Sequence, residues 1–149
     1  MNVQFLGNKE LLKLKKTAFL ASSTISSETV LKCYDWATEM RRHGECVISG
    51  FSSKLEQDVL HFLLKGTQLI IIPAELQAPM EQNRLLIISV SNATRQSRTT
   101  ALARNRYICE ISERILFVGV TESSSLNILK TTFENKLLAS DIQTKGMRT

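Results

Sequence analysis

Residues 17–49 read TAFLASSTISSETVLKCYDWATEMRRHGECVIS. They begin an alternation of predicted strands and helices that decides the fold. Thr17 to Ala21 is a short apolar run that predicts a strand, and a serine-rich turn follows it. Apolar residues then recur at helical spacing, at Val30, Cys33, Tyr34, Ala37 and Met40. Gly44 ends this predicted helix, and Cys46 to Ile48 predicts the second strand.

The same alternation continues to the end of the chain. Apolar runs predict three further strands at residues 69–72, 85–88 and 115–118. Helical spacing predicts a helix with Leu55, Val59, Phe62 and Leu63 on one face, one over residues 99–109, and a last one with Leu126, Leu129, Phe133 and Leu137. Apolar strands alternating with helices are typical of a doubly wound parallel sheet with helices on both faces.

We therefore predict a single α/β domain over residues 1–149, with a Rossmann-like sheet of about five parallel strands. Numbered along the chain, these strands are expected in the order 3-2-1-4-5. Residues 1–16 are expected to be a lead-in segment and residues 139–149 a polar tail.

Composition narrows the class of protein. The chain is 43% hydrophobic, which is normal for a globular domain, and its apolar runs are too short to span a bilayer. The first residues lack the apolar stretch of a signal peptide, so we expect a cytoplasmic protein that does not contact membranes. The three cysteines form no CxxC pair, and neither histidine lies at a ligand spacing from them. We therefore expect reduced cysteines, no metal and no cofactor.

Common catalytic and nucleotide-binding motifs are missing from the sequence. No GxGxxG comes after the first predicted strand, and the GxxxxGK[ST] motif of P-loop proteins is absent. No GxSxG motif of the α/β-hydrolases is found either. Ligands of parallel sheets bind beyond the carboxyl ends of the strands, so the residues directly after each predicted strand are the candidates for a site.

Hydroxyl-rich segments follow four of the predicted strands, and an arginine run follows one of them. Between Asn92 and Arg106 there are four arginines and no acid, a pattern that favours an anionic partner. Serine hydroxyls, backbone N–H groups and arginines together suit a phosphate. The candidate ligand-binding residues are Ser22, Ser23, Ser49, Gly50, Ser52, Arg95, Arg98, Arg104, Asn105, Arg106, Ser123, Ser124 and Ser125.

Each part of this pattern has another explanation. Serine and threonine are good helix N-caps, and an arginine run can be a solvated surface. Asn105 either ties its helix to a strand end or contacts the ligand. Arg104 and Arg106 point in different directions around a helix, so we expect one to reach the site and the other to pair with Glu110.

Several segments resemble the DNA-processing protein A (DprA/Smf) family in the same order. They are Val47-Ile48-Ser49-Gly50-Phe51 with Leu55-Glu56, Arg104-Asn105-Arg106-Tyr107-Ile108 with Ile111-Ser112, Ile115 to Val118, and Ser123 to Leu126. Leu6-Gly7-Asn8 and the stretch from Ser49 to Pro73 resemble short stand-alone relatives of that family. The resemblance implies a Rossmann-like domain, of the group that includes the phosphoribohydrolases, and single-stranded DNA as a ligand.

The sequence also departs from that family pattern. Ala21 stands where a glycine is usual, Ser23 where an arginine is usual, and Ser124 where the last turn has a glycine. The glycine-rich turn and the catalytic glutamate of the phosphoribohydrolases are absent, and Glu122 does not take that glutamate's place.

We therefore expect a non-catalytic binding module for single-stranded nucleic acid or a nucleotide. Two alternatives remain. One is a phosphoribohydrolase-like enzyme that uses Glu56 or Glu75, and the other is a degenerate scaffold that works by self-association. By analogy with the family, we also expect a homodimer.

Overall fold

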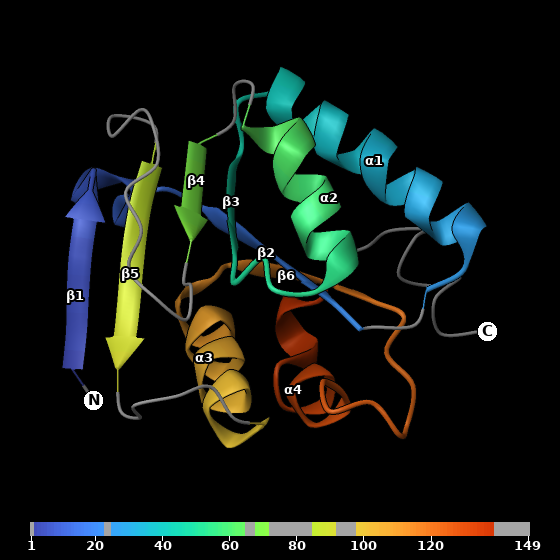
Figure 1. Cartoon of the computed structure of the whole chain (residues 1–149). Coiled ribbons are helices and arrows are strands. Elements are labelled where there is room, and N and C mark those ends of the chain that lie inside the picture. The colour runs from blue at the N-terminus through green and yellow to red at the C-terminus, as the bar shows by residue number, and fades with distance from the viewer. Residues whose placement is uncertain (1, 23–24, 65–67, 72–84, 92–97, 139–149) are drawn as a thin grey trace.

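A six-stranded sheet runs through the structure, a computed structural model that describes residues 2–22, 25–64, 68–71, 85–91 and 98–138. Its strands lie in the order β1-β5-β4-β3-β2-β6 (Figure 1). Their bounds are β1 Asn2–Gly7, β2 Lys16–Ala21, β3 Cys46–Ser49, β4 Gln68–Ile71, β5 Leu85–Ser91 and β6 Arg114–Val118. Every neighbouring pair is parallel except β1 with β5. The predicted α/β class and parallel sheet are thus confirmed.

The predicted strand order is wrong. β5, the fourth strand of the prediction, pairs with β4 at Ile70↔Leu86 instead of lying beside β2. β2 pairs on one side with β3 and on the other with β6, at Phe19↔Leu116. The chain therefore builds the sheet in one direction from β2 to β5, and α3 then crosses to the other side of β2 before β6.

The lead-in segment contains a strand that was not predicted. β1 pairs antiparallel with β5, with Leu6 opposite Ile87, and forms one edge of the sheet. The short 3-10 helix η1, Lys9–Lys13, then leads into β2. Residues 139–149, the predicted polar tail, lie outside the described residues.

Helices cover both faces of the sheet, as predicted. The helices α1 (Ser27–Arg42) and α2 (Lys54–Leu63) pack on one face, and α3 (Arg98–Ile111) and α4 (Asn127–Thr132) pack on the other (Figure 1). β2 is buried along its whole length between them. Its alternate residues divide the core, because Phe19 packs in the cluster under α1 and α2 and Leu20 in the cluster under α3 and α4.

Local sequence signals explain where the helices begin and end. Ser26 caps α1, and Gly44 follows its last turn with a φ of 66°, where its lack of a Cβ avoids strain.

The predicted last helix is not continuous. α4 ends at Thr132, the short 3-10 helix η2 covers Glu134–Lys136, and Leu137 pairs with Ile115 beside the sheet.

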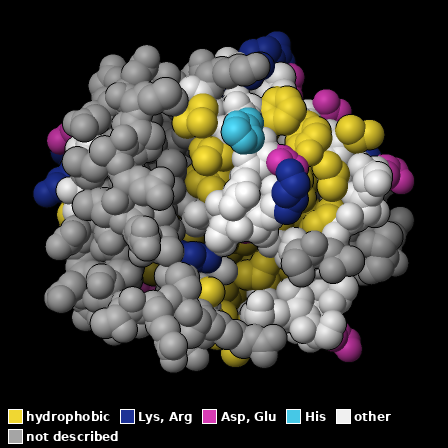
Figure 2. Space-filling model, in the orientation of Figure 1, with side chains coloured by type: hydrophobic (Ala, Val, Ile, Leu, Met, Phe, Trp, Pro, Cys, Tyr) yellow, Lys and Arg dark blue, Asp and Glu magenta, His cyan; other side chains and the backbone are white. Residues whose placement is uncertain are grey.

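Two aromatic pairs fix the outer side of α1. Phe19 stacks on Trp36, and Tyr34 stacks on Phe62 and donates a hydrogen bond to Asp58 over 3.0 Å. Apolar side chains also reach the surface over α1 and α2 (Figure 2), among them Leu31, which is 63% exposed. Tyr34 and Trp36 therefore serve the packing of α1 against α2 and β2.

The three cysteines, Cys33, Cys46 and Cys109, are free and buried. Burial in apolar surroundings raises the pKa of each thiol to about 12, so the reactive thiolate is scarce at neutral pH.

None of the helices in the described part of the chain is both long and apolar enough to cross a lipid bilayer.

An ion pair ties the start of β2 to the start of β6, and it gives a first prediction. Lys16 Nζ lies 3.0 Å from Glu113 Oε1 and donates to the carbonyl oxygens of Leu12 and Leu14, both at 2.9 Å. Partial burial raises the pKa of Glu113, but hydrogen bonds from Lys16 and its charge outweigh this and lower the pKa overall. Replacing Glu113 with Gln should therefore lower the free energy of unfolding by about 1 kcal/mol near pH 7, since water screens this half-exposed carboxylate.

The effect should depend on pH with a definite sign. A carboxyl group whose pKa is lowered in the folded state stabilises above its unfolded pKa of about 4.3, and this contribution is lost as the pH falls through the folded pKa. Urea unfolding near pH 7 and near pH 3 should show the difference between wild type and Glu113→Gln shrinking in acid. Glu10→Gln, at an exposed pair with Lys13, is the control and should change little. A pH-independent difference at Glu113 would contradict the ion pair.

Candidate phosphate-binding site

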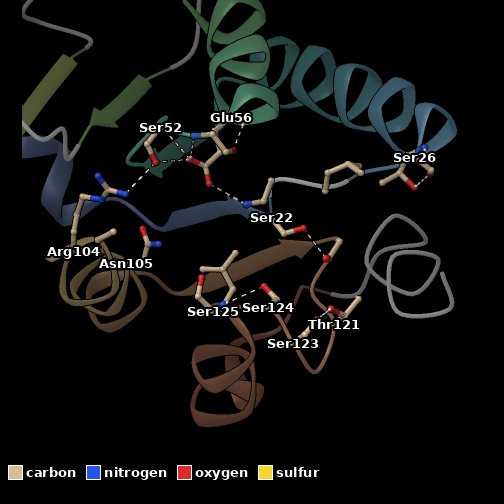
Figure 3. Close-up of a pocket in the computed structure, with 17 residues that line it drawn as sticks. Ser22, Ser26, Ser52, Glu56, Arg104, Asn105, Thr121, Ser123, Ser124 and Ser125 are labelled. Carbon is tan, nitrogen blue, oxygen red and sulfur yellow. Dashed lines mark hydrogen bonds between the residues drawn. The ribbon is translucent and has the colours of Figure 1, made fainter. Parts of the chain in front are cut away.

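A cavity of about 860 Å³ opens at the carboxyl ends of β2 and β6, where the chain reverses its direction across the sheet. Ligands of open α/β sheets bind at this kind of reversal. Five segments contribute to its wall (Figure 3). Its described lining residues are Ala21, Ser22, Ile25, Ser26, Thr29, Ser52, Ser53, Glu56, Ala101, Arg104, Asn105, Gly119, Thr121, Ser123, Ser124, Ser125 and Leu126.

Glu56 holds the upper wall of this cavity together. It is only 4% exposed, and its Oε2 accepts a hydrogen bond from the Ala21 N–H at 3.0 Å. Its Oε1 accepts from the N–H groups of Ser52 at 2.9 Å and Ser53 at 3.2 Å, and from the Ser52 hydroxyl at 3.4 Å. Glu56 and Ser53 form a capping box at the start of α2. The carboxylate therefore joins the end of β2 to the start of α2.

Arg104 brings a buried positive charge to the cavity from α3. The residue is 8% exposed, and its Nη2 donates to the Ser52 hydroxyl at 3.0 Å. Its Nε is buried without a hydrogen-bond partner, and no carboxylate in the described residues forms an ion pair with it. Burial lowers the pKa of Arg104, while the charge of Glu56 opposes this; an arginine nevertheless stays protonated. A buried charge with so few partners is well suited to receive an anion.

Hydroxyl groups make up most of the rest of the lining. The oxygens of Ser53 and Ser124 accept hydrogen bonds from the backbone N–H groups of Glu56 at 3.3 Å and Leu126 at 3.2 Å. Their hydroxyl hydrogens are therefore available to a ligand oxygen. Ser22 instead donates to the carbonyl of Gly119 at 2.7 Å and so joins the ends of β2 and β6.

The start of α1 adds a further positive potential. Ser26 caps this 16-residue helix, and Ser26 and Thr29 both line the cavity. The helix dipole leaves a partial positive charge at this end. Each helix has an acidic residue in its first turn, Glu28 in α1 and Glu56 in α2, which offsets part of this charge. The Ser26 hydroxyl oxygen accepts from the Thr29 N–H at 3.3 Å. The cavity thus combines one buried cation, the start of a 16-residue helix and free hydroxyl hydrogens.

The structure brings seven of the thirteen candidate residues to this cavity. They are Ser22, Ser52, Arg104, Asn105, Ser123, Ser124 and Ser125. Asn105 points toward the cavity beside Arg104 (Figure 3), and its side chain makes no hydrogen bond within the described residues.

Other candidates lie elsewhere. Ser49 and Gly50 are buried and do not line the cavity; the Ser49 hydroxyl accepts from the Phe51 N–H at 3.1 Å. The left-handed residue of this turn is Phe51, with a φ of 49°, and not Gly50. Arg106 is exposed, and its Nε lies 3.6 Å from Glu110, which confirms that only one of the two arginines turns to the cavity.

Three candidates cannot be placed. Ser23 and Arg95 lie outside the described residues. Arg98 begins α3, but its side chain is not described. The strand before Arg95, β5, is separated from β2 by β4 and β3.

Five lining residues with polar side chains were not among the ligand-binding candidates: Ser26, Thr29, Ser53, Glu56 and Thr121. A signal for two of them was present, because Ser53 and Glu56 have the spacing of a capping box. That spacing predicts the helix start, but not the hydrogen bond to Ala21 from another part of the sheet.

Solved structures show which proteins share this fold. DNA processing protein A from Helicobacter pylori, described for its single-stranded DNA binding mode, superposes with a TM-score of 0.72 at 17% identity over 91% of this chain and 69% of the other. DNA processing protein A from Streptococcus pneumoniae gives 0.75 at 17% identity over 97% of this chain. The chain spans 58% of that structure.

A more distant likeness is to the molybdenum cofactor carrier protein of Chlamydomonas reinhardtii, with a TM-score of 0.52 at 8% identity over 87% of this chain and 91% of the other. No protein-family model matches the sequence, and no curated protein matches it. At these identities the comparisons show the fold. The resemblance to DNA processing protein A is thus confirmed at the level of the fold.

Proposed function

We propose that this chain binds single-stranded nucleic acid by taking a backbone phosphate into the cavity at the ends of β2 and β6. The buried Arg104 carries the proposal, because it lines the cavity and its one hydrogen bond within the described residues goes to Ser52. An arginine beside a phosphate forms charge-assisted hydrogen bonds that are about twice as strong as neutral ones. The hydroxyls of Ser53 and Ser124 would donate to the remaining phosphate oxygens.

The form of the cavity favours a single strand over a duplex. Arg104 is buried, so a phosphate must enter the cavity to reach it. A flexible single strand can bend one phosphate inward, whereas a duplex holds its phosphates on a stiff helix. The described lining contains no aromatic residue on which a base could stack. Recognition would therefore depend on the backbone more than on base identity. The single-stranded DNA binding described for the Helicobacter pylori protein of the same fold is consistent with this proposal.

The alternative of a nucleotide-cleaving enzyme has weaker support. Such an enzyme needs a carboxylate poised at the sugar. Glu56 is the one carboxylate in the described lining, and hydrogen bonds from Ala21, Ser52 and Ser53 occupy both of its oxygens. Glu75 lies outside the described residues. We therefore keep binding without turnover as the proposed function, and the homodimer stays a prediction.

Competition experiments test whether the phosphate is what the cavity binds. Fluorescence anisotropy with labelled (dT)12 should show binding that weakens as salt is raised, because phosphate neutralisation releases counterions. Unlabelled thymidine 5′-monophosphate should compete, and thymidine, the same nucleoside without the phosphate, should not. A duplex of the same length should bind more weakly than (dT)12. Equal competition by thymidine and its monophosphate would contradict the proposal.

A further inference from the structure

Phe51 lies in the turn between β3 and α2, and its backbone is strained. Its φ of 49° falls in the left-handed region, and no other residue besides glycine has a positive φ in the described part of the chain. A bulky residue rarely adopts this conformation, because its Cβ is pushed toward the backbone. Gly50, directly before it, could adopt a positive φ without strain but does not. Strain of this kind persists only where the surrounding structure holds it, and it concentrates at functional sites.

The side chain and the backbone of Phe51 are both held in place. Phe51 is 6% exposed and belongs to the core cluster under α1 and α2, together with Val59 and Leu63 of α2. Its backbone N–H donates to the Ser49 hydroxyl oxygen at 3.1 Å. Burial of the aromatic ring thus offsets the strain of the turn and anchors the turn to the core.

Ser52 follows Phe51 directly and connects this turn to the cavity. Its N–H donates to Glu56 Oε1 at 2.9 Å, and its hydroxyl lies 3.4 Å from the same oxygen. The hydroxyl oxygen also accepts from Arg104 Nη2 at 3.0 Å (Figure 3). Ser52 itself is exposed, so packing does little to hold it. Its position between the carboxylate and the guanidinium therefore follows from the backbone that Phe51 sets.

The orientation of Arg104 depends on this hydroxyl. Within the described residues the guanidinium makes one hydrogen bond, and Ser52 is its acceptor. A long side chain that is already held in place loses less conformational freedom when a ligand binds. If the turn relaxed, Arg104 would lose its acceptor, and the ligand would have to order the side chain itself.

We propose that Phe51 is a positioning residue for the phosphate site. Its buried ring holds the left-handed turn, the turn places the Ser52 hydroxyl, and this hydroxyl fixes Arg104 in the cavity. The inference rests on the proposed function and deepens it, because it assigns part of the affinity for a phosphate to a residue that does not line the cavity.

Two substitutions at Phe51 separate the strained backbone from the packing of the ring. Phe51→Ala and Phe51→Gly both remove the ring, but only glycine adopts a positive φ without strain. In fluorescence anisotropy, Phe51→Ala should bind (dT)12 about fivefold more weakly than wild type, the cost of ordering one long side chain on binding. Phe51→Gly should reduce this loss to about twofold. A residue that only filled the core would give the opposite order, because glycine also removes the Cβ and adds freedom to the unfolded chain.

The matched control is Leu63→Ala. It removes apolar contacts from the same core cluster at the other end of α2, away from the turn. Its affinity for (dT)12 should stay within about twofold of wild type, because the change is remote from the cavity.

A double-mutant cycle tests whether Phe51 acts through Ser52. Ser52→Ala removes the acceptor of Arg104 and should weaken (dT)12 binding about fivefold. If both residues act on Arg104 in series, the double variant should bind within about twofold of either single variant, whereas independent effects would multiply. Ser52→Ala removes one exposed hydroxyl, so it tests the link to Arg104 even where a change at Phe51 costs the fold.

A measurement without ligand keeps this inference apart from the proposed function. In heteronuclear NMR spectra, the Arg104 Nε–H signal is identified by its loss in Arg104→Met. It should exchange slowly with water in wild type, because Nε is buried. Exchange should be faster in Phe51→Ala and Ser52→Ala, and slower again in Phe51→Gly.

The outcomes separate the two proposals. If wild type binds no (dT)12, the proposed function fails, and the Nε–H signal still decides whether Phe51 fixes Arg104. Equal exchange rates in wild type, Phe51→Ala and Ser52→Ala would overturn the positioning role. Weaker (dT)12 binding by Phe51→Gly than by Phe51→Ala, or losses that multiply in the double variant, would overturn it while the cavity stands.

Discussion

Replacement of Glu56 with alanine should lower the free energy of unfolding by about 3–5 kcal/mol, a large part of the stability of a domain of this size. The reason is that three backbone N–H groups, those of Ala21, Ser52 and Ser53, lose their acceptor at once. Each buried donor left unsatisfied costs about 1–3 kcal/mol. Ser52 can recover part of this through water, whereas the bond to Ala21 is buried.

Urea unfolding followed by circular dichroism measures this effect. Glu45→Ala, which removes an exposed carboxylate before β3, is the control and should change little. Glu56→Gln keeps one acceptor oxygen and should fall between wild type and alanine. If Glu56→Ala is as stable as wild type, the carboxylate is not the structural tie described here. The enzyme alternative would then gain support, since catalytic groups are often held at a cost to stability.

The elements of the fold could be predicted from the sequence, but their order in the sheet could not. The apolar runs at β2, β3 and β6 are buried strands because helices cover both faces of the sheet, and the run of apolar residues predicts this. Periodicity contains no information on which strand lies beside which. β5 joins β4, and only the paired backbones of the two strands show this.

β1 shows a signal that was present but not used. Asn2, Val3, Gln4 and Phe5 alternate polar and apolar residues, as an edge strand does. The segment has only six residues and contains no turn signal before it, so the alternation alone did not distinguish it from a lead-in arm. Its partner β5 supplies the context that decides the pairing.

The sequence predicted the lining residues that follow directly after a strand. It did not predict the lining residues whose roles depend on contacts between distant parts of the chain. Ser22 and the serines at 123–125 follow β2 and β6, so the rule for parallel sheets places them correctly. That rule did not distinguish Ser52 and Ser53, which line the cavity, from Ser49 and Gly50, which are buried and do not line it. The role of Glu56 depends on a contact between residues 35 positions apart, which no local pattern contains.

Replacement of Arg104 with methionine should weaken the binding of (dT)12 at least about tenfold, the largest effect on binding that we expect. Methionine fills much of the same space without the charge, and the lost charge-assisted hydrogen bonds are worth about 1.5–3 kcal/mol. The fold should persist, because the guanidinium makes one hydrogen bond within the described residues, to Ser52. Arg106→Met on the same helix removes an exposed arginine that pairs with Glu110, and (dT)12 affinity should stay within about twofold of wild type.

The central claim, that a backbone phosphate enters the cavity and meets Arg104, is tested most directly by a salt titration of (dT)12 binding. For single strands the logarithm of the binding constant falls with the logarithm of the salt concentration by about 0.7 for each phosphate neutralised. The account predicts that Arg104→Met flattens this slope by about that amount and that Arg106→Met leaves it unchanged. Equal slopes and affinities for wild type and folded Arg104→Met would contradict it.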